Sequence, residues 1–341
     1  MTDVVQPVPS HPPVESAAPA GHESKVAVLA AMGANLLIAV GKLVAGLMTG
    51  SAALLAEAGH SLADTVNQVF LLVGINLSHA EADEKHPHGY GKEAFFWSFL
   101  AAIFIFVAGA VFSLYEGIRT AVEHHEHDRG SFELIVAFGV LIMALVFESA
   151  SFVVAVRGLI AGAKRRGWTI ARFVWESPEV TIKTVFFEDS AAIGGLIVAM
   201  AGLGLSEVTG NEIFDAIASI IIGLLLALVA VLLGRQSRDL LLGAAAPPET
   251  REALHELVNS FPEVLAVNRM LSMLVGSHSI LVTGELHVRP GLTTAQIENL
   301  IQRIDDRITQ EIPDISETFW ELHGTESSLQ AAADAEDAGQ S

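Results

Sequence analysis

Long apolar runs dominate the first two thirds of the chain. A hydrocarbon core of about 30 Å is crossed by about 20 helical residues, and six runs reach that length. The fifth run is the most polar of the six because it contains Lys183, Glu188 and Asp189. The pattern predicts six membrane-spanning helices over residues 26–49, 51–80, 94–122, 132–160, 178–206 and 211–234.

The pattern changes after Pro247-Pro248, which ends the sixth apolar run. Residues 249–261 have helical spacing, and Thr293 is placed to cap a second helix. Alternating positions predict strands over residues 264–275, 279–288 and 315–323. The order helix, strand, strand, helix, strand favours a ferredoxin-like domain.

The predicted fold is therefore an all-α six-helix transmembrane domain followed by a C-terminal cytoplasmic ferredoxin-like α+β domain. The first segment is rich in Pro, Ala and Ser without Lys or Arg, and the last is acidic and rich in Ala, Gly and Ser. We predict a disordered tail over residues 1–24, a transport domain over 25–245, a dimerisation or regulatory domain over 246–324 and an acidic disordered tail over 325–341.

Composition narrows the function classes. Of the 341 residues, 51% are hydrophobic and only 17% charged, which is typical of an integral membrane protein. No cysteine is present, so thiolate metal sites and thiol nucleophiles are excluded. The net charge of −20 argues against nucleic acid as a partner. The sequence contains no Walker loop, nucleophile elbow or HExxH motif, so it does not predict an enzyme.

Basic residues near the ends of the apolar runs predict the orientation in the bilayer. The links on one side of the predicted membrane hold most of them, whereas the opposite turns at residues 49–50 and 205–211 hold none. Both termini are therefore expected in the cytoplasm, with the helices in the cell (inner) membrane. The basic residues that indicate this side are Lys85, Lys92, Lys164, Arg165, Arg166, Arg172, Arg235 and Arg238.

Ionisable side chains inside a membrane helix usually face a pathway or a partner. Glu57, His60 and Asp64 lie on one face of the second run because their offsets are three and four. The imidazole and carboxylate of His60 and Asp64 form half of a four-coordinate site for a divalent ion. Glu188 and Asp189 of the fifth run are expected to complete it. We interpret Asn35, Lys42, Glu116 and Glu148 as packing or interfacial groups.

Three motifs carry a resemblance to a known family: GSAALLAEAGHSLAD, HPHGYGKEA and FDAIASIIIG. Between residues 25 and 323 the chain resembles the cation diffusion facilitator family, whose members are homodimers that export zinc or a related divalent metal in exchange for protons. The resemblance implies metal and protons as substrates, and no permanently bound cofactor. It also implies His60, Asp64 and Asp189 as ligands.

The chain departs from the family pattern four residues before Asp189, where Val185 has no donor atom. The runs VFFEDSAAIGG, HSLADTVNQ and FESASFVVAV instead resemble the zinc transporter nine-like branch. Glu188 is a candidate for the missing oxygen ligand, although a neighbouring helical residue points about 100° away. One nitrogen and several oxygens suit zinc, and also manganese, iron(II) or cobalt.

Candidates for secondary metal sites lie outside the membrane helices. The resemblance implies a site after the second run at Asp83 and His86, where Tyr90 replaces an expected histidine and a hydrated polar turn is the alternative. In the soluble domain the candidates are Glu285, His287, Glu321 and His323, for which a solvated strand face is the alternative. A short run of His124, His125 and His127 is interpreted as inert.

Two other functions are the alternatives to a transporter. Val185 and the altered loop site would suit a membrane scaffold or metal sensor that descends from a carrier, but buried carboxylates have no use in a scaffold. A channel would show a re-entrant filter or rings of charge, and neither is visible.

Overall fold

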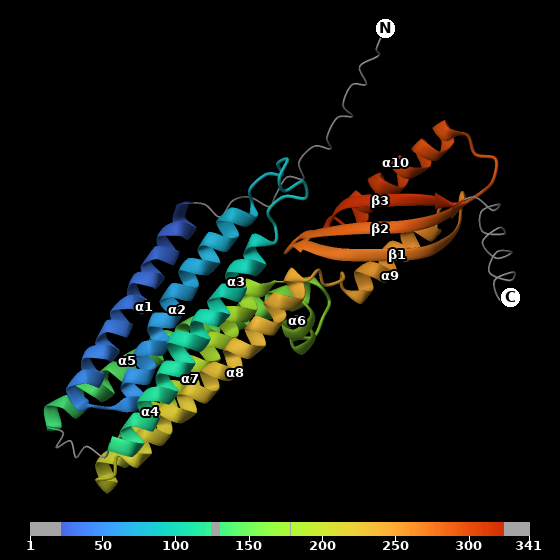
Figure 1. Ribbon diagram of the computed structural model, residues 1–341. Helices are drawn as coiled ribbons and strands as arrows, with labels where there is room; N and C mark the ends of the chain where they lie inside the picture. Colours follow the sequence, from blue (N-terminus) through green and yellow to red (C-terminus); the bar gives the residue numbers. More distant parts are fainter. Residues whose placement is uncertain (1–21, 124–129, 178, 324–341) are drawn as a thin grey trace, which may run out of the picture.

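The computed structural model describes residues 22–123, 130–177 and 179–323. A long helical bundle forms one part and a small α+β domain the other (Figure 1). The predicted tails fall largely outside the described residues, except that α1 begins at His22. The bundle contains α1 (His22–Thr49), α2 (Ala52–Ser78), α3 (Glu93–Phe104), η1 (Ile105–Val111), α4 (Phe112–Glu123), α5 (Ser131–Arg165), α6 (Ile170–Glu176), α7 (Val180–Thr209) and α8 (Ile213–Leu241).

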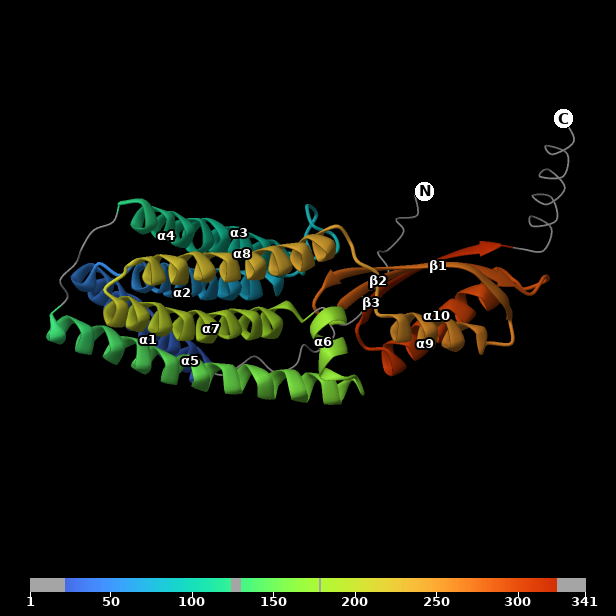
Figure 2. The ribbon, with the colours of Figure 1, turned by 90° about the horizontal axis from the view of Figure 1, so that it is seen from below.

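The long helices of the bundle lie side by side (Figure 2). Among the described residues, four helical stretches are long and apolar enough to cross a membrane: Glu93–Glu123, Ser131–Arg165, Ile182–Thr209 and Ile213–Leu241. α1 contributes a shorter apolar stretch, Asn35–Thr49, and α2 carries the polar face predicted above. All six predicted spans are therefore helical, and four of them meet the length and composition of a membrane helix.

The third long helix contains a π-helical segment, η1, between α3 and α4. π-helical turns inside α-helices are rare and often lie at functional sites. Here η1 packs beside α2, where a Cβ on Gly59 would lie 3.4 Å from the Ala108 carbonyl oxygen of η1 and 2.8 Å from Cδ1 of Phe112, the first residue of α4. The sequence pattern predicted one continuous span here and did not indicate the π-helical turns.

Two other features differ from the sequence expectation. The link between α5 and α7 contains a short helix, α6, that the apolar pattern did not predict. Thr169 caps it by accepting a hydrogen bond from the backbone N–H of Arg172. α8 also extends beyond the apolar segment 211–234 to Leu241, and Leu240 of its last turn is buried in the core of the soluble domain.

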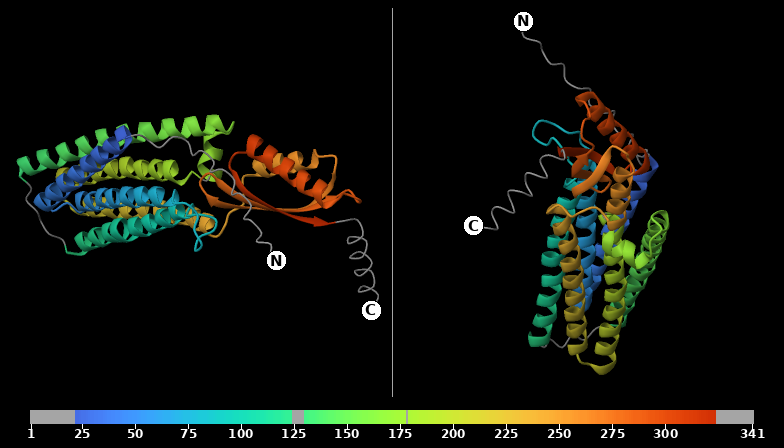
Figure 3. Two further views of the ribbon diagram at one scale, coloured as in Figure 1. Left: turned by 90° about the horizontal axis from the view of Figure 1, so that it is seen from above. Right: turned by 90° about the vertical axis from the view of Figure 1, so that its right-hand side faces the viewer.

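The soluble domain has the predicted order of elements: α9 (Pro248–Asn259), β1 (Val264–Gly276), β2 (Ser279–Val288), α10 (Thr294–Glu311) and β3 (Ile315–His323). β2 is central, antiparallel to β1 and parallel to β3. Thr293 caps α10 as predicted, and Gln296 completes the capping box. Both helices cover one face of the sheet (Figure 3), and the core between them includes Leu254, Val282 and Ile304.

The two parts of the chain share contacts. Phe95 of α3 and Leu240 of α8 belong to the apolar core of the soluble domain. The α2–α3 loop lies against the β1–β2 turn so closely that a Cβ on Gly91 would lie 2.4 Å from the Val275 carbonyl oxygen. His88 Nδ1 is 2.7 Å from Glu317 Oε2 of β3. The ends of α3 and α8 are thus packed into the domain that follows them.

A charged cluster joins the ends of α5 and α7 to the same domain. Arg166 Nη2 lies 3.5 Å from Glu179 Oε1 and 3.9 Å from Asp314 Oδ2. His278 Nδ1 is 3.6 Å from Asp314 Oδ1. Hydrogen bonding by Asp314 raises the pKa of His278, and the same contact lowers the pKa of Asp314. The cluster is therefore most cohesive when His278 is protonated and Asp314 is ionised.

We predict that this cluster weakens in mild alkali. The pKa of His278 is raised by folding, so its contribution is complete below the ordinary histidine value of about 6.5 and is lost as the pH rises through the higher folded-state value. Melting of the purified protein should show wild type losing more stability than His278→Gln between pH 6 and 8.5, by at most about 1 kcal/mol because the pair is half exposed. Equal losses in both proteins would contradict this role for His278.

Candidate metal centre in the helical bundle

The predicted polar face of α2 is turned into the bundle. Glu57, His60, Asp64 and Asn67 are all buried. His60 and Asp64 are one turn apart, and His60 Nδ1 lies 3.4 Å from Asp64 Oδ1. Neither ring nitrogen of His60 has a hydrogen-bond partner among the described residues, and Asp64 Oδ1 also has none. Buried polar atoms are almost always hydrogen-bonded, so these atoms are available to a ligand.

α7 brings the two predicted acidic residues to the interior, but they face different helices. Asn67 Nδ2 donates hydrogen bonds to Glu188 Oε1 and Oε2, at 2.6 Å each. Glu188 is therefore directed at α2. Asp189 lies near the Ser151 side chain of α5, and its Oδ2 atom has no partner among the described residues. The rotation of about 100° between neighbouring helical residues accounts for this division.

The carboxylates nevertheless share one region of the bundle. Glu188, Asp189 and Glu148 of α5 are all close enough to Asp64 to act on its charge. Within the described part of the chain, no three His, Asp or Glu side chains converge at the distances of a bound metal ion. The structure thus gathers His60, Asp64, Glu188 and Asp189 in the core without assembling a coordination sphere.

Sequence reasoning missed three members of this polar region: Asn67, Lys42 and Glu148, the last of which was also interpreted as a packing or interfacial group. Asn67 lies seven residues after His60 and three after Asp64, so the helical offsets that identified the face could have found it. Lys42 was interpreted as a packing or interfacial group, but its ammonium donates to Glu57 Oε2 at 2.9 Å and to Ser61 Oγ at 2.8 Å. No pattern in the sequence indicates that partner, because α1 and α2 meet only in the folded chain.

The loop candidate is organised by hydrogen bonds. Asp83 Oδ1 accepts from the backbone N–H groups of Lys85 and His86, and Asp83 Oδ2 accepts from the Tyr90 hydroxyl at 2.8 Å. The His86 ring also contacts the Tyr90 ring, with centroids 4.2 Å apart. Both oxygens of Asp83 thus already have partners, and a metal site at Asp83 and His86 stays a prediction. His124, His125 and His127 lie outside the described residues.

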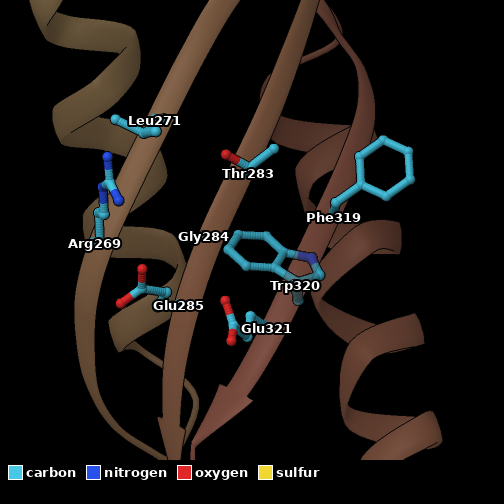
Figure 4. Close-up of a pocket in the computed structure, with 8 residues that line it drawn as sticks. All are labelled: Arg269, Leu271, Thr283, Gly284, Glu285, Phe319, Trp320 and Glu321. Carbon is cyan, nitrogen blue, oxygen red and sulfur yellow. The ribbon is translucent and has the colours of Figure 1, made fainter.

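The soluble-domain candidates lie on the sheet face that the helices leave open. The strand register pairs Glu285 with Glu321 and His287 with His323, which the sequence pattern did not indicate. Arg269 of β1 pairs with Glu285 on its other side. Figure 4 shows the two glutamates next to each other beside a hollow on this face, with Arg269 along the neighbouring strand. The pairing supports one shared face, whereas metal binding there stays a prediction.

The helical bundle and much of the rest of the chain are similar to known transport proteins. Residues 28–242 match the model of the cation efflux transmembrane domain. The "Proton-coupled zinc antiporter SLC30A9, mitochondrial" of Mus musculus is 32% identical over 303 residues, which is 87% of this chain and 52% of that protein. "Metal tolerance protein C4" of Arabidopsis thaliana is 34% identical over 222 residues, 65% of this chain and 48% of that protein.

A bacterial relative matches over nearly its full length. The "Manganese efflux system protein MneP" of Bacillus subtilis is 26% identical over 296 residues, which cover 86% of this chain and 94% of that protein. By contrast, the chain spans about half the length of the SLC30A9 proteins that it matches. The family match covers well over half of the chain and includes α2, α5 and α7. This chain therefore belongs to the cation efflux family of membrane transporters.

Proposed function

We propose that the chain is a secondary-active exporter of a divalent metal cation, most favourably zinc, in exchange for protons. The transported ion would bind between α2 and α7, at His60, Asp64, Asp189 and Glu188. One observation carries the proposal: His60, Asp64 and Asp189 hold buried polar atoms that have no partner among the residues that the structure describes, in the interior of an apolar bundle. Such atoms are costly unless a ligand satisfies them.

The choice of zinc rests on the donor set and on the relatives. An imidazole with carboxylates binds zinc more tightly than manganese in the usual affinity order. The SLC30A9 relatives are named as zinc antiporters, whereas the bacterial relative is named for manganese. Val185 removes one donor from the expected set, so selectivity for manganese, iron(II) or cobalt is the competing form of this proposal.

Exchange follows from the chemistry of the ligands. A metal ion binds deprotonated carboxylates and a neutral imidazole, so its arrival releases protons and their return favours its release. Alternating access would come from helices rocking about a site near the middle of the membrane. In this scheme α1 and α2 also span the bilayer, which gives six spans with both termini in the cytoplasm of the cell (inner) membrane.

The soluble domain is assigned a supporting role. We propose a ferredoxin-like homodimerisation domain, with regulation by metal at Glu285, His287, Glu321 and His323 as a second role. Its contacts with α3 and α8 would connect its state to the helices.

One observation favours a non-transporting metal sensor or scaffold as the second candidate. The predicted ligands do not converge on one point in this structure, and Glu188 is held by Asn67 instead. A transporter that alternates between two states is nevertheless expected to dismantle its site in part of the cycle. Measured transport decides between the two candidates.

The first prediction concerns transport. His60→Ala, Asp64→Ala and Asp189→Ala should each reduce metal flux into proteoliposomes with an imposed pH gradient to the protein-free level, because each removes a donor atom. Zinc, manganese, iron(II) and cobalt are tested in parallel. Asn35→Ala, on a polar residue of α1, is the matched control and should retain flux. Wild-type flux in the His60 or Asp64 variant would remove this site from the mechanism.

The second prediction concerns the missing donor. Val185→His places an imidazole four residues before Asp189 and should raise zinc affinity about tenfold while leaving manganese affinity nearly unchanged, because imidazole favours zinc. Calorimetric titration of the purified variant with each metal measures both. Val185→Leu, which adds bulk without a donor, is the control. A zinc affinity equal to that of the leucine variant would show that position 185 does not face the ion.

The third prediction tests whether Asn67 competes with the ion for Glu188. Glu188→Gln should weaken zinc binding, whereas Asn67→Leu should strengthen it by about tenfold, because the Asn67 amide occupies both Glu188 oxygens in this structure. Thr65→Val, which removes a hydroxyl from the same helix, is the control. If Glu188→Gln binds zinc as wild type does, Glu188 is not a ligand and the Asn67 contact only packs α2 against α7.

A further inference from the structure

We propose, on the basis of the function proposed above, that Lys42 and Glu57 form a gate between the metal site and the distal end of the bundle. The distal end is defined as the end that carries the α1–α2 turn at Gly50 and the α7–α8 turn at Gly210, opposite the soluble domain (Figure 3).

The first argument is the burial of the pair. Lys42 Nζ lies 2.9 Å from Glu57 Oε2, and both side chains are 0% exposed. The Ser61 hydroxyl accepts a further hydrogen bond from Lys42. A buried ion pair is weak evidence for stability, since apolar residues of similar volume often stabilise a core equally well. Its presence in an apolar bundle therefore indicates a functional role.

The ion pair also lies closer to the distal end of the bundle than the proposed metal ligands do. Glu57 comes six residues after Ser51, and His60 and Asp64 follow at nine and thirteen. With a rise of about 1.5 Å per residue, these positions lie about 9, 13 and 20 Å from the start of α2. Lys42, seven residues before Thr49, reaches a similar depth from α1. The ion pair thus lies between the proposed site and the distal end.

The Glu57 carboxylate also reaches α7. Glu57 Oε1 has no hydrogen-bond partner among the described residues. It is directed at Gly195, where a Cβ would lie 2.2 Å from this oxygen. The same position would be 3.7 Å from Ile222 of α8. Glu57 therefore lies between Lys42 of α1 and Gly195 of α7, and a side chain at position 195 would displace its carboxylate.

Beyond the ion pair, α2, α7 and α8 are packed together. α7 and α8 approach so closely that a Cβ on Gly202 would lie 2.3 Å from the Ala218 Cβ. Asp215 at the start of α8 accepts hydrogen bonds from the Ser51 hydroxyl and the Ala52 N–H, at 2.6 Å each. In the proposed gate, these contacts correspond to a state that is shut on the distal side, with Lys42 and Glu57 as its charged layer.

The chemistry of the pair explains how it would exclude metal. With its carboxylate held by an ammonium, Glu57 offers little attraction to a dication, and the Lys42 charge repels one. An ion that leaves His60 and Asp64 toward the distal end passes only when α7 moves away from α2 and opens the bridge at Gly195. The pair thus prevents return of the ion while the site faces the other side.

The absence of cysteine from the chain permits a direct test. Ala192→Cys places one thiol on α7, buried and three residues after Asp189. A membrane-impermeant thiol reagent is applied to sealed vesicles from each side in turn. From the distal side the thiol should react slowly in the otherwise wild-type chain, and at least about tenfold faster with Lys42→Met, with Glu57→Gln or with both. The double variant leaves no unpaired charge, so it remains informative where a single variant fails to fold.

Three controls separate gating from structural damage. Lys42→Arg keeps the pair and should keep the thiol protected. The exchange Lys42→Glu with Glu57→Lys should restore protection. Lys183→Met removes the other buried lysine of the bundle, which donates to the Ser177 carbonyl oxygen instead, and should leave labelling unchanged.

Continued protection in the folded double variant would overturn the proposal, as would equal opening by Lys183→Met. Labelling is read without transport, so the gate and the proposed export activity fail separately. If the variants expose the thiol to the reagent but the protein transports no metal, the proposed gate stands and the proposed export activity is refuted.

Discussion

The cost of burying charge in an apolar bundle governs the arrangement of α1, α2, α5 and α7. Two of the buried carboxylates accept hydrogen bonds from side chains of neighbouring elements: Glu57 Oε2 from Lys42, and both Glu188 oxygens from Asn67. Both ring nitrogens of His60 and Asp189 Oδ2 have no partner within the described part of the chain. The contacts of each side chain make this distinction, and residue type alone does not.

The elements that local pattern determines could be predicted from the sequence. The three strands, the cap at Thr293 and the long helices follow from periodicity and capping chemistry, even in α7 with its charged residues. α6 and the last turns of α8 could not be predicted from apolar runs, because their burial comes from other parts of the fold. His60 and Asp64 could be found from their spacing within one helix. Lys42 could not be found in this way, because its partner Glu57 lies on another helix, α2.

The junction with the soluble domain links the two halves mechanically. Phe95 and Leu240 lie in the core of that domain, and Gly91 lets the α2–α3 loop touch the β1–β2 turn. A movement of α3 or α8 at the membrane therefore displaces core residues rather than a free tether. Packed cores respond to such displacement by discrete rearrangement. The domain is thus positioned to favour one helix arrangement over another.

The same reasoning bears on Glu188 and the donor missing at Val185. Both Glu188 oxygens accept from one Asn67 amide, and the amide oxygen of Asn67 has no partner among the described residues. For Glu188 to bind an ion, at least one of those hydrogen bonds must break, and Asn67 would then rotate or follow it. In the proposed function, ion binding and the contact between α2 and α7 would therefore compete for the same carboxylate. That competition would couple occupancy of the site to the separation of the two helices, which is the coupling that alternating access requires.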